Sequence, residues 1–191
     1  HDTLVILPTG GGKSLCYQVP ALLLPGLTVV VSPLISLMKD QVDALEARGI
    51  AAAFINSTLT NGQVSDRMAR AARGEIKMLY MAPERFDAGN TAEQLKRGGV
   101  SLLAIDEAHC ISQWGHDFRP SYLRMRAVRE ALGDPPTIAL TATATPTVRR
   151  DIARQLALRD PKVVITGFDR TTLSYSVVRA RNDAENDLLL V

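Results

Sequence analysis

Short apolar runs recur along the chain, and more polar segments with a helical repeat separate them. The runs predict β-strands at Leu4–Leu7, Thr28–Ser32, Ala52–Asn56, Met78–Met81, Leu102–Asp106, Thr137–Thr141 and Val163–Thr166. Positions 29–31 and 102–105 are apolar throughout rather than in alternation, which is typical of strands covered on both faces. The pattern therefore predicts an α/β fold, a parallel β-sheet with helices on both faces.

The segments between the runs carry signals for helix starts and for one apolar face per helix. Ser32-Pro33 and Thr145-Pro146 both fit an N-cap residue followed by proline at the first helical position, and Gly49 fits the end of the first helix. Apolar side chains three or four positions apart form three groups: Leu34, Met38, Val42 and Leu45; Met125, Val128 and Leu132; Val148, Ile152 and Leu156. We interpret these stripes as core packing.

Polar residues follow several of the predicted strands. In parallel α/β sheets, ligands bind outside the carboxyl ends of the strands, so these residues should converge in space. They are Pro8–Ser14, Ser32-Pro33, Ala82–Arg85, Asp106–His109 and Thr141–Thr143. We therefore expect one site assembled from five loops.

The glycine-rich turn at 8–14 lies between the first apolar run and an amphipathic stretch. Its glycines allow positive φ and point backbone N–H groups inward, and the next helix adds the positive end of its dipole. In such a loop the lysine reaches the β- and γ-phosphates and the serine hydroxyl holds Mg²⁺. The predicted nucleotide-binding residues are Thr9, Gly10, Gly11, Gly12, Lys13 and Ser14. Leu7 stands where the strict motif has glycine, and a turn with a chance Lys-Ser pair is the alternative.

Two adjacent carboxylates close a buried strand. Asp106 is placed to hold Mg²⁺ opposite Ser14, and Glu107 to orient and deprotonate the water that attacks the γ-phosphate. Without a cation between them the two charges would repel each other, and the alternative is an acidic pair at the surface. Together with the glycine turn, the pair predicts nucleoside triphosphate hydrolysis, with Lys13, Asp106 and Glu107 as catalytic residues.

Composition narrows the class of protein only slightly. The 191 residues carry a formal net charge of +2, so any nucleic-acid surface must be a local patch. Cys16 and Cys110 belong to no CxxC or His/Cys cluster, which indicates neither a zinc site nor a disulfide framework. A reducing intracellular compartment, cytoplasm with nucleoid or nucleus, fits best. No apolar run approaches the roughly 20 residues of a membrane span.

The strand–helix pattern continues to about residue 167 and then frays. Because barely one strand precedes the glycine turn, we expect residues 1–167 to be a single domain that is truncated at its N-terminus. Residues 168–191, with an acidic stretch at 183–187, are expected to be a linker followed by the start of a further element.

Several motifs, in order, resemble those of superfamily-two helicases: Gly10–Ser14, Asp106–His109 and Thr141–Thr145. The longer stretch Asp106–Pro120, DEAHCISQWGHDFRP, resembles the RecQ family specifically, as do Leu15–Gln18 and Ser32–Gln41. The resemblance runs from about residue 2 to residue 180. It implies the first RecA-like lobe of an ATP-dependent DNA helicase that moves 3′ to 5′ on single-stranded DNA and unwinds duplex DNA, with a second RecA-like lobe of the same parent protein as partner.

The resemblance also implies roles for further residues. His109 corresponds to the last residue of the DEAH box, which links the ATP site to the second lobe, and Thr141 and Thr143 correspond to the motif that relays the nucleotide state. The segment 113–119 resembles an aromatic-rich loop that couples DNA contact to hydrolysis. A base stacked on an aromatic ring contributes roughly 1–3 kcal/mol. The predicted nucleic-acid contacts are Ser32, Lys39, Arg85, Gln113, Trp114, Phe118 and Arg119.

Other interpretations remain for some of these residues. Trp114 could be a core anchor, Lys39 and Arg85 could be solvated helix charges, and Arg67, Arg70 and Arg73 fit a solvated helix face. For the whole chain, an RNA helicase lobe of the DEAH type, a non-hydrolysing nucleic-acid-binding module and a P-loop kinase are the alternatives. The family's adenine-reading segment and the arginines of the second lobe lie outside these 191 residues, so we expect the chain alone to be nearly inactive.

Overall fold

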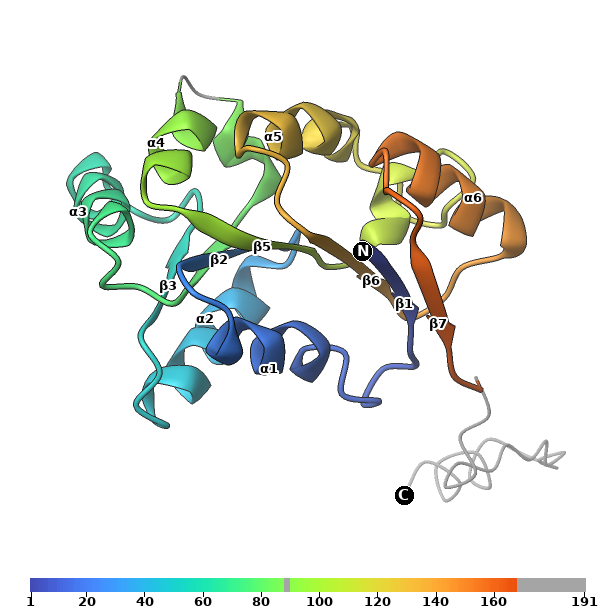
Figure 1. Cartoon of the computed structure of the whole chain (residues 1–191), viewed down its shortest axis with the longest axis horizontal. Coiled ribbons are helices and arrows are strands. Elements are labelled where there is room, and N and C mark those ends of the chain that lie inside the picture. The colour runs from blue at the N-terminus through green and yellow to red at the C-terminus, as the bar shows by residue number, and fades with distance from the viewer. Residues whose placement is uncertain (88–89, 168–191) are drawn as a thin grey trace, which may run out of the picture.

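The computed structural model describes residues 1–87 and 90–167, and these residues form one seven-stranded sheet with the strand order β3-β4-β2-β5-β6-β1-β7 (Figure 1). Every pairing is parallel. The strands are β1 (Thr3–Ile6), β2 (Leu27–Val31), β3 (Ala52–Ile55), β4 (Met78–Met81), β5 (Val100–Ile105), β6 (Thr137–Thr141) and β7 (Lys162–Ile165). All the predicted strands are present, and the predicted fold class is confirmed.

Helices cover both faces of the sheet. One face carries α1 (Leu15–Leu23) and α2 (Ile35–Glu46), and the other carries α3 (Asn61–Ala72), α4 (Thr91–Arg97), α5 (Met125–Ala131) and α6 (Pro146–Gln155) (Figure 1). Each side buries its own apolar cluster, the smaller beneath α1 and α2 and the larger beneath the other four helices. Strands β2 and β4 are buried at every position, as expected of strands covered on both faces, although β2 includes the buried polar residue Thr28.

The two predicted helix starts have different outcomes. The Thr145 Oγ1 accepts a hydrogen bond from the Val148 N–H at 3.3 Å, with proline in the first turn, so that N-cap is confirmed. The prediction for Ser32 is wrong, because α2 begins at Ile35 and has no side-chain cap. The Ser32 N–H instead donates to the Met81 carbonyl at 3.1 Å, which prolongs the sheet ladder past the end of β2.

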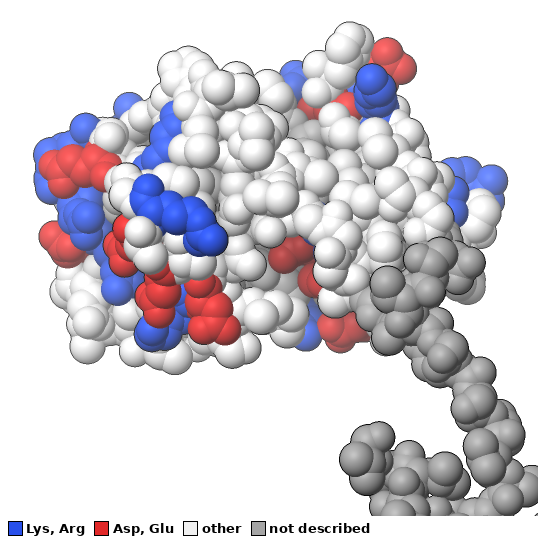
Figure 2. Space-filling model, turned by 90° about the horizontal axis from the view of Figure 1, so that it is seen from below, with Lys and Arg blue, Asp and Glu red and all other residues white. Residues whose placement is uncertain are grey.

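Charged side chains are unevenly distributed over the surface of the protein. Figure 2 shows Lys, Arg, Asp and Glu gathered mainly toward one end of the face seen from below, while a broad part of that face carries few charged side chains. Helix α1 exposes Leu15, Val19, Leu22 and Leu23. The expectation that Arg67 is a freely solvated charge is wrong, because its guanidinium lies 4.4 Å from the centroid of the Phe54 ring. Arg73 is exposed, Arg70 is half-buried, and both pair with Glu75, as a solvated helix face predicts.

Three expectations concern membrane spans, the linker and the cysteines. No helix within the described ranges is long and apolar enough to cross a membrane. The predicted linker at 168–191 lies outside the described residues. Cys16 and Cys110 are both free thiols.

Candidate nucleotide-binding site

The glycine turn and the acidic pair line the same cavity. It has a volume of about 370 Å³ and lies at the carboxyl ends of β1, β2 and β5, where strand order predicts a ligand. Its lining includes Thr9, Gly10, Gly12, Lys13, Ser14, Ser32, Asp106 and Glu107. Segments about ninety positions apart in sequence are thereby brought face to face, as the sequence predicts.

The turn depends on glycine for two separate reasons. Gly10 and Gly12 have φ of 82° and 81°, in the region that other residues rarely adopt. Gly11 has no positive φ, but a Cβ on it would lie 2.9 Å from the Pro8 carbonyl oxygen. That same oxygen accepts the Gly11 N–H at 2.9 Å, so it cannot withdraw without losing the hydrogen bond that closes the turn.

Lys13 and Ser14 lead from the turn into α1. The Lys13 ammonium donates to the Leu7 carbonyl oxygen at 3.4 Å and forms part of the cavity wall. Ser14 is the N-cap residue of α1, yet its side chain makes no capping hydrogen bond. The first backbone N–H groups of α1 and the Ser14 hydroxyl are therefore placed where an anion and its cation bind at a helix start.

The carboxylates are adjacent but electrostatically different. Burial, with repulsion from Glu107, raises the pKa of Asp106 to about 6, against the opposing effects of the Glu107 N–H, Lys13 and His109. The Asp106 Oδ1 accepts that N–H at 2.9 Å. A cation close to these two carboxylates would stabilise their ionised forms. The oxygen donors of Asp106 and Ser14 fit a hard divalent cation such as Mg²⁺.

Glu107 is the first member of a hydrogen-bonded chain that ends at the loop after β6. Its backbone is left-handed, with φ of 47°, which turns the side chain toward His109. The His109 Nδ1 lies 3.2 Å from the Glu107 Oε2 and 2.8 Å from the Thr141 Oγ1. Because the Thr141 hydroxyl donates to the Thr143 carbonyl oxygen at 3.1 Å, it accepts from His109, so Nδ1 carries the proton. The hydrogen bond from His109 holds the pKa of Glu107 below its usual value.

A polar and aromatic cluster in the cavity wall was not predicted. The Gln18 amide donates to the Gln41 Oε1 at 2.8 Å and to the Tyr80 hydroxyl at 3.2 Å. The rings of Tyr17 and Tyr80 meet edge to face at 6.3 Å, and Tyr17, Gln41 and Tyr80 line the cavity. Gln18 and Gln41 lie in stretches that resemble the RecQ family, and that resemblance is the sequence signal that could have identified them. Tyr80 lies in a fully buried strand, and nothing in the sequence distinguishes it from a core residue.

Comparison with known proteins decides the family. Residues 1–152 match the model of the family described as DEAD/DEAH box helicase. The chain belongs to the DEAD/DEAH box helicase family.

Relatives within this helicase family agree with the RecQ resemblance. The chain is 53% identical over 183 residues to the ATP-dependent DNA helicase RecQ of Bacillus subtilis, covering 95% of this chain and 31% of that protein. It is 49% identical over 177 residues to the protein of the same name from Pasteurella multocida, covering 93% and 28%. The RecQ resemblance is thereby confirmed, and the chain spans about a third of the length of these curated relatives.

Solved structures support the helicase fold. The Pyrococcus furiosus Hef helicase domain matches with a TM-score of 0.63 and 21% identity over 86% of this chain and 34% of that one. The Mycobacterium smegmatis helicase Lhr, bound to ssDNA and AMP-PNP, matches with a TM-score of 0.65 and 22% identity over 87% and 24%. At these identities the likeness shows the fold alone.

Four of the predicted DNA contacts of this helicase domain lie on one loop. Trp114 is 74% exposed, so the interpretation as a core anchor is wrong. Gln113 is also exposed, and Phe118 is half-buried. Arg119 pairs with Asp117 at 2.9 Å and donates to the Pro33 carbonyl oxygen at 3.4 Å, which ties the loop to the end of β2.

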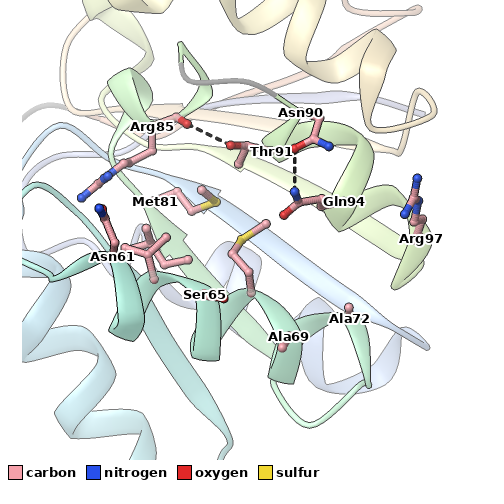
Figure 3. Close-up of a pocket in the computed structure, with 13 residues that line it drawn as sticks. Asn61, Ser65, Ala69, Ala72, Met81, Arg85, Asn90, Thr91, Gln94 and Arg97 are labelled. Atoms are coloured by element: carbon pink, nitrogen blue, oxygen red, sulfur yellow. Dashed lines mark hydrogen bonds between the residues drawn. The ribbon is translucent and has the colours of Figure 1, made fainter.

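The other three predicted contacts are dispersed over the helicase domain. Ser32 is buried and lines the nucleotide cavity rather than an outer surface, which corrects its placement. Lys39 is exposed on α2 and pairs with Asp43. The Arg85 Nε donates to the Asn56 carbonyl oxygen at 3.1 Å. Arg85 also lines a second, larger cavity of about 570 Å³ between α3 and α4, with Asn61 and Asn90 beside it (Figure 3).

Proposed function

We propose that this domain is the first RecA-like lobe of an ATP-dependent DNA helicase that moves 3′ to 5′ on single-stranded DNA and unwinds duplex DNA. The observation that carries the proposal is the shared cavity of the phosphate loop and the acidic pair. The RecQ relatives, named as ATP-dependent DNA helicases, support DNA rather than RNA as the substrate. Intact Lys13, Asp106 and Glu107 disfavour a non-hydrolysing binding module.

The residues of the cavity divide the work on ATP. The Lys13 ammonium and the backbone N–H groups of the turn, except that of Gly11, which donates to Pro8, would bind the β- and γ-phosphates. Ser14 and Asp106 would hold Mg²⁺. Mg²⁺ bound by these two residues would supply positive charge to neutralise the phosphate oxygens. Glu107 orients the attacking water and accepts its proton, and its lowered pKa keeps it ionised for that role.

His109 couples the ATP site to the rest of the lobe. Its Nδ1–H is shared between Glu107 and Thr141, so reorientation of Glu107 is felt at Thr141 and Thr143. The His109 ring also stacks on His116 at 4.1 Å, with 19° between the ring planes. His116 belongs to the loop that carries Trp114. We infer that DNA contact on this loop reaches the carboxylate through that ring pair.

DNA and the second lobe complete the motor. Gln113, Trp114, Phe118 and Arg119 contact the tracked strand, with Lys39 and Arg85 as backbone contacts further along. Residues 1–167 form the lobe, and 168–191 lead into a second lobe that supplies arginine to the γ-phosphate. Such an arginine contributes roughly 10³-fold or more in rate, so the chain alone is expected to be nearly inactive. Two free thiols support action in a reducing compartment inside the cell.

The test is Glu107→Gln in the full-length protein. We expect ATP binding within about threefold of the wild type and a fall in DNA-stimulated turnover of about a hundredfold or more, because the carboxylate that accepts the proton is gone. Lys13→Ala is the contrasting variant and should weaken ATP binding itself. Unchanged turnover in Glu107→Gln would refute the proposal. Stimulation by RNA oligomers but not by DNA would favour the RNA helicase instead.

A further inference from the structure

A second group of donor atoms lies on the far side of His109 from Glu107. The His109 Nε2, the Cys110 Sγ and a carboxylate oxygen of Asp117 all lie within 4.8 Å of one another. The sulfur is 3.8 Å from Nε2 and 3.7 Å from the Asp117 Oδ2. His109 and Cys110 are buried, while Asp117 opens to solvent. No zinc motif is visible in the sequence here, because two of the donor residues are adjacent and the third comes from the following loop.

The hydrogen bonds leave this group one proton short. The Nδ1 of His109 already carries the ring proton that Glu107 and Thr141 share, so Nε2 of the neutral imidazole presents a lone pair. The Cys110 thiol has a single hydrogen, and it is directed to Asp117. Nε2, 3.8 Å from the same sulfur, competes with Asp117 for that one hydrogen. A cation held by all three groups would satisfy the imidazole nitrogen and the sulfur together.

We propose that His109 Nε2, Cys110 Sγ and Asp117 Oδ2 bind one Zn²⁺, with water as the fourth ligand. Bonds of about 2.0–2.3 Å in tetrahedral geometry place the donor atoms about 3.3–3.8 Å apart. The separations of 3.7 and 3.8 Å between the sulfur and the two other donor atoms agree with that range. Thiolate and imidazole favour Zn²⁺ over Mg²⁺, which separates this site from the oxygen donors of the nucleotide cavity.

The surroundings of His109 match those of a zinc ligand. A metal-bound histidine usually donates its other N–H to a carboxylate, which fixes the tautomer and ring orientation. Here Glu107 accepts at 3.2 Å from Nδ1.

Two protein groups oppose the metal. Burial raises the pKa of the Cys110 thiol to about 12, and Arg119 occupies the same Asp117 oxygen at 2.9 Å. Exposed ion pairs of that kind contribute little, so Arg119 can be displaced.

Zinc binding releases one proton, that of the Cys110 thiol. Zn–N, Zn–S and Zn–O bonds form, the Cys110 S–H bond breaks, and the proton passes to solvent. The metal then joins the 113–119 loop to the residue that contacts Glu107. Zinc thereby holds the loop that carries Trp114 in a fixed position, a property separate from the proposed helicase activity.

The test uses Co²⁺ as a spectroscopic substitute for Zn²⁺ on the 191-residue chain. We expect one Co²⁺ per chain, a sulfur-to-cobalt charge-transfer band, and displacement by Zn²⁺ but not by excess Mg²⁺. Trp114 is the only tryptophan in the sequence and lies along the chain between Cys110 and Asp117. Its fluorescence should therefore change in the same titration. Cys16→Ser is the matched control and should keep the band.

Two variants decide the outcome. Cys110→Ser should abolish the charge-transfer band, and Asp117→Ala should weaken binding at least tenfold. If circular dichroism shows that Cys110→Ser does not fold, the exposed Asp117 alone decides. A band that persists in a folded Cys110→Ser, or unchanged affinity in Asp117→Ala, overturns the proposal.

Discussion

At the scale of single residues, the folded structure changes the protonation of Asp106 near neutral pH. Its pKa is raised from 3.8 to about 6 in the folded chain by burial and by Glu107. Between these values the folded state retains a proton that the unfolded state has lost. This carboxyl therefore lowers the free energy of unfolding progressively as pH rises from about 4 to about 6.

Asp106→Asn removes this cost. Urea unfolding in the absence of nucleotide and Mg²⁺ should show the variant more stable than wild type near pH 7.5, by up to about 3 kcal/mol. The two proteins should be nearly equal below about pH 4, where both states of the wild type are protonated. A variant that is less stable than wild type at both pH values would contradict the sign of the shift.

Gly11 tests the closure of the phosphate loop. In Gly11→Ala the new methyl group meets the Pro8 carbonyl oxygen at 2.9 Å, so we expect about 1–3 kcal/mol of destabilisation and weaker nucleotide binding. Gly62→Ala is the matched control, because its Cβ in α3 meets nothing within 4 Å. That control should gain about 0.5–1 kcal/mol by chemical denaturation. Equal losses in the two variants would argue against a tight turn.

At the scale of elements, α6 depends on its first residue. Thr145→Ala removes the acceptor for the Val148 N–H and should cost about 0.5–2 kcal/mol in urea unfolding. Thr147→Ala, two positions later on the exposed side of the same helix, should cost less than half of that. A reversed order would place the stabilisation elsewhere in the helix.

The elements also show how far sequence reasoning extends. Strands such as β2 and β5 were predictable because continuous apolar runs fit only a sheet covered on both faces. The start of α2 was not, because the Ser32 N–H bonds to Met81, a partner distant in sequence. The cavity could be predicted from two motifs and from the rule that ligands bind outside the carboxyl ends of parallel strands. The Gln18–Tyr80 hydrogen bond could not, since it joins side chains 62 positions apart.

At the scale of the whole molecule, Asp2 connects distant parts of the fold. Its carboxylate accepts from the Arg129 guanidinium at 2.7 Å and from the backbone N–H groups of Thr137 at 2.9 Å and Arg159 at 2.6 Å. Burial alone raises its pKa, but these three donors together hold the pKa below its usual value. The group thereby joins the segment before β1 to α5, β6 and the turn before β7.

Asp2→Ala should destabilise the chain strongly, by about 3–5 kcal/mol, because it removes the buried charge partner of Arg129 and leaves that guanidinium only the more exposed Asp134 carboxylate. Asp160→Ala, at an exposed carboxylate whose ion-pair partner is also exposed, is the matched control and should change the free energy of unfolding by less than about 1 kcal/mol. Chemical denaturation measures both. A loss in Asp2→Ala no larger than that of the control would show that Asp134 and the carbonyl partners are enough to satisfy Arg129.

The place of β1 in the sheet also governs the order of assembly. This strand is made early but pairs only with β6 and β7, and Thr3 aligns with Ile138 and Lys162. During synthesis it must wait for more than a hundred further residues before either neighbour exists, and such distant pairings form slowly. We therefore expect the phosphate loop to acquire its shape late, so that the first appearance of nucleotide binding in a refolding experiment would mark the pairing of β1 with its two neighbours.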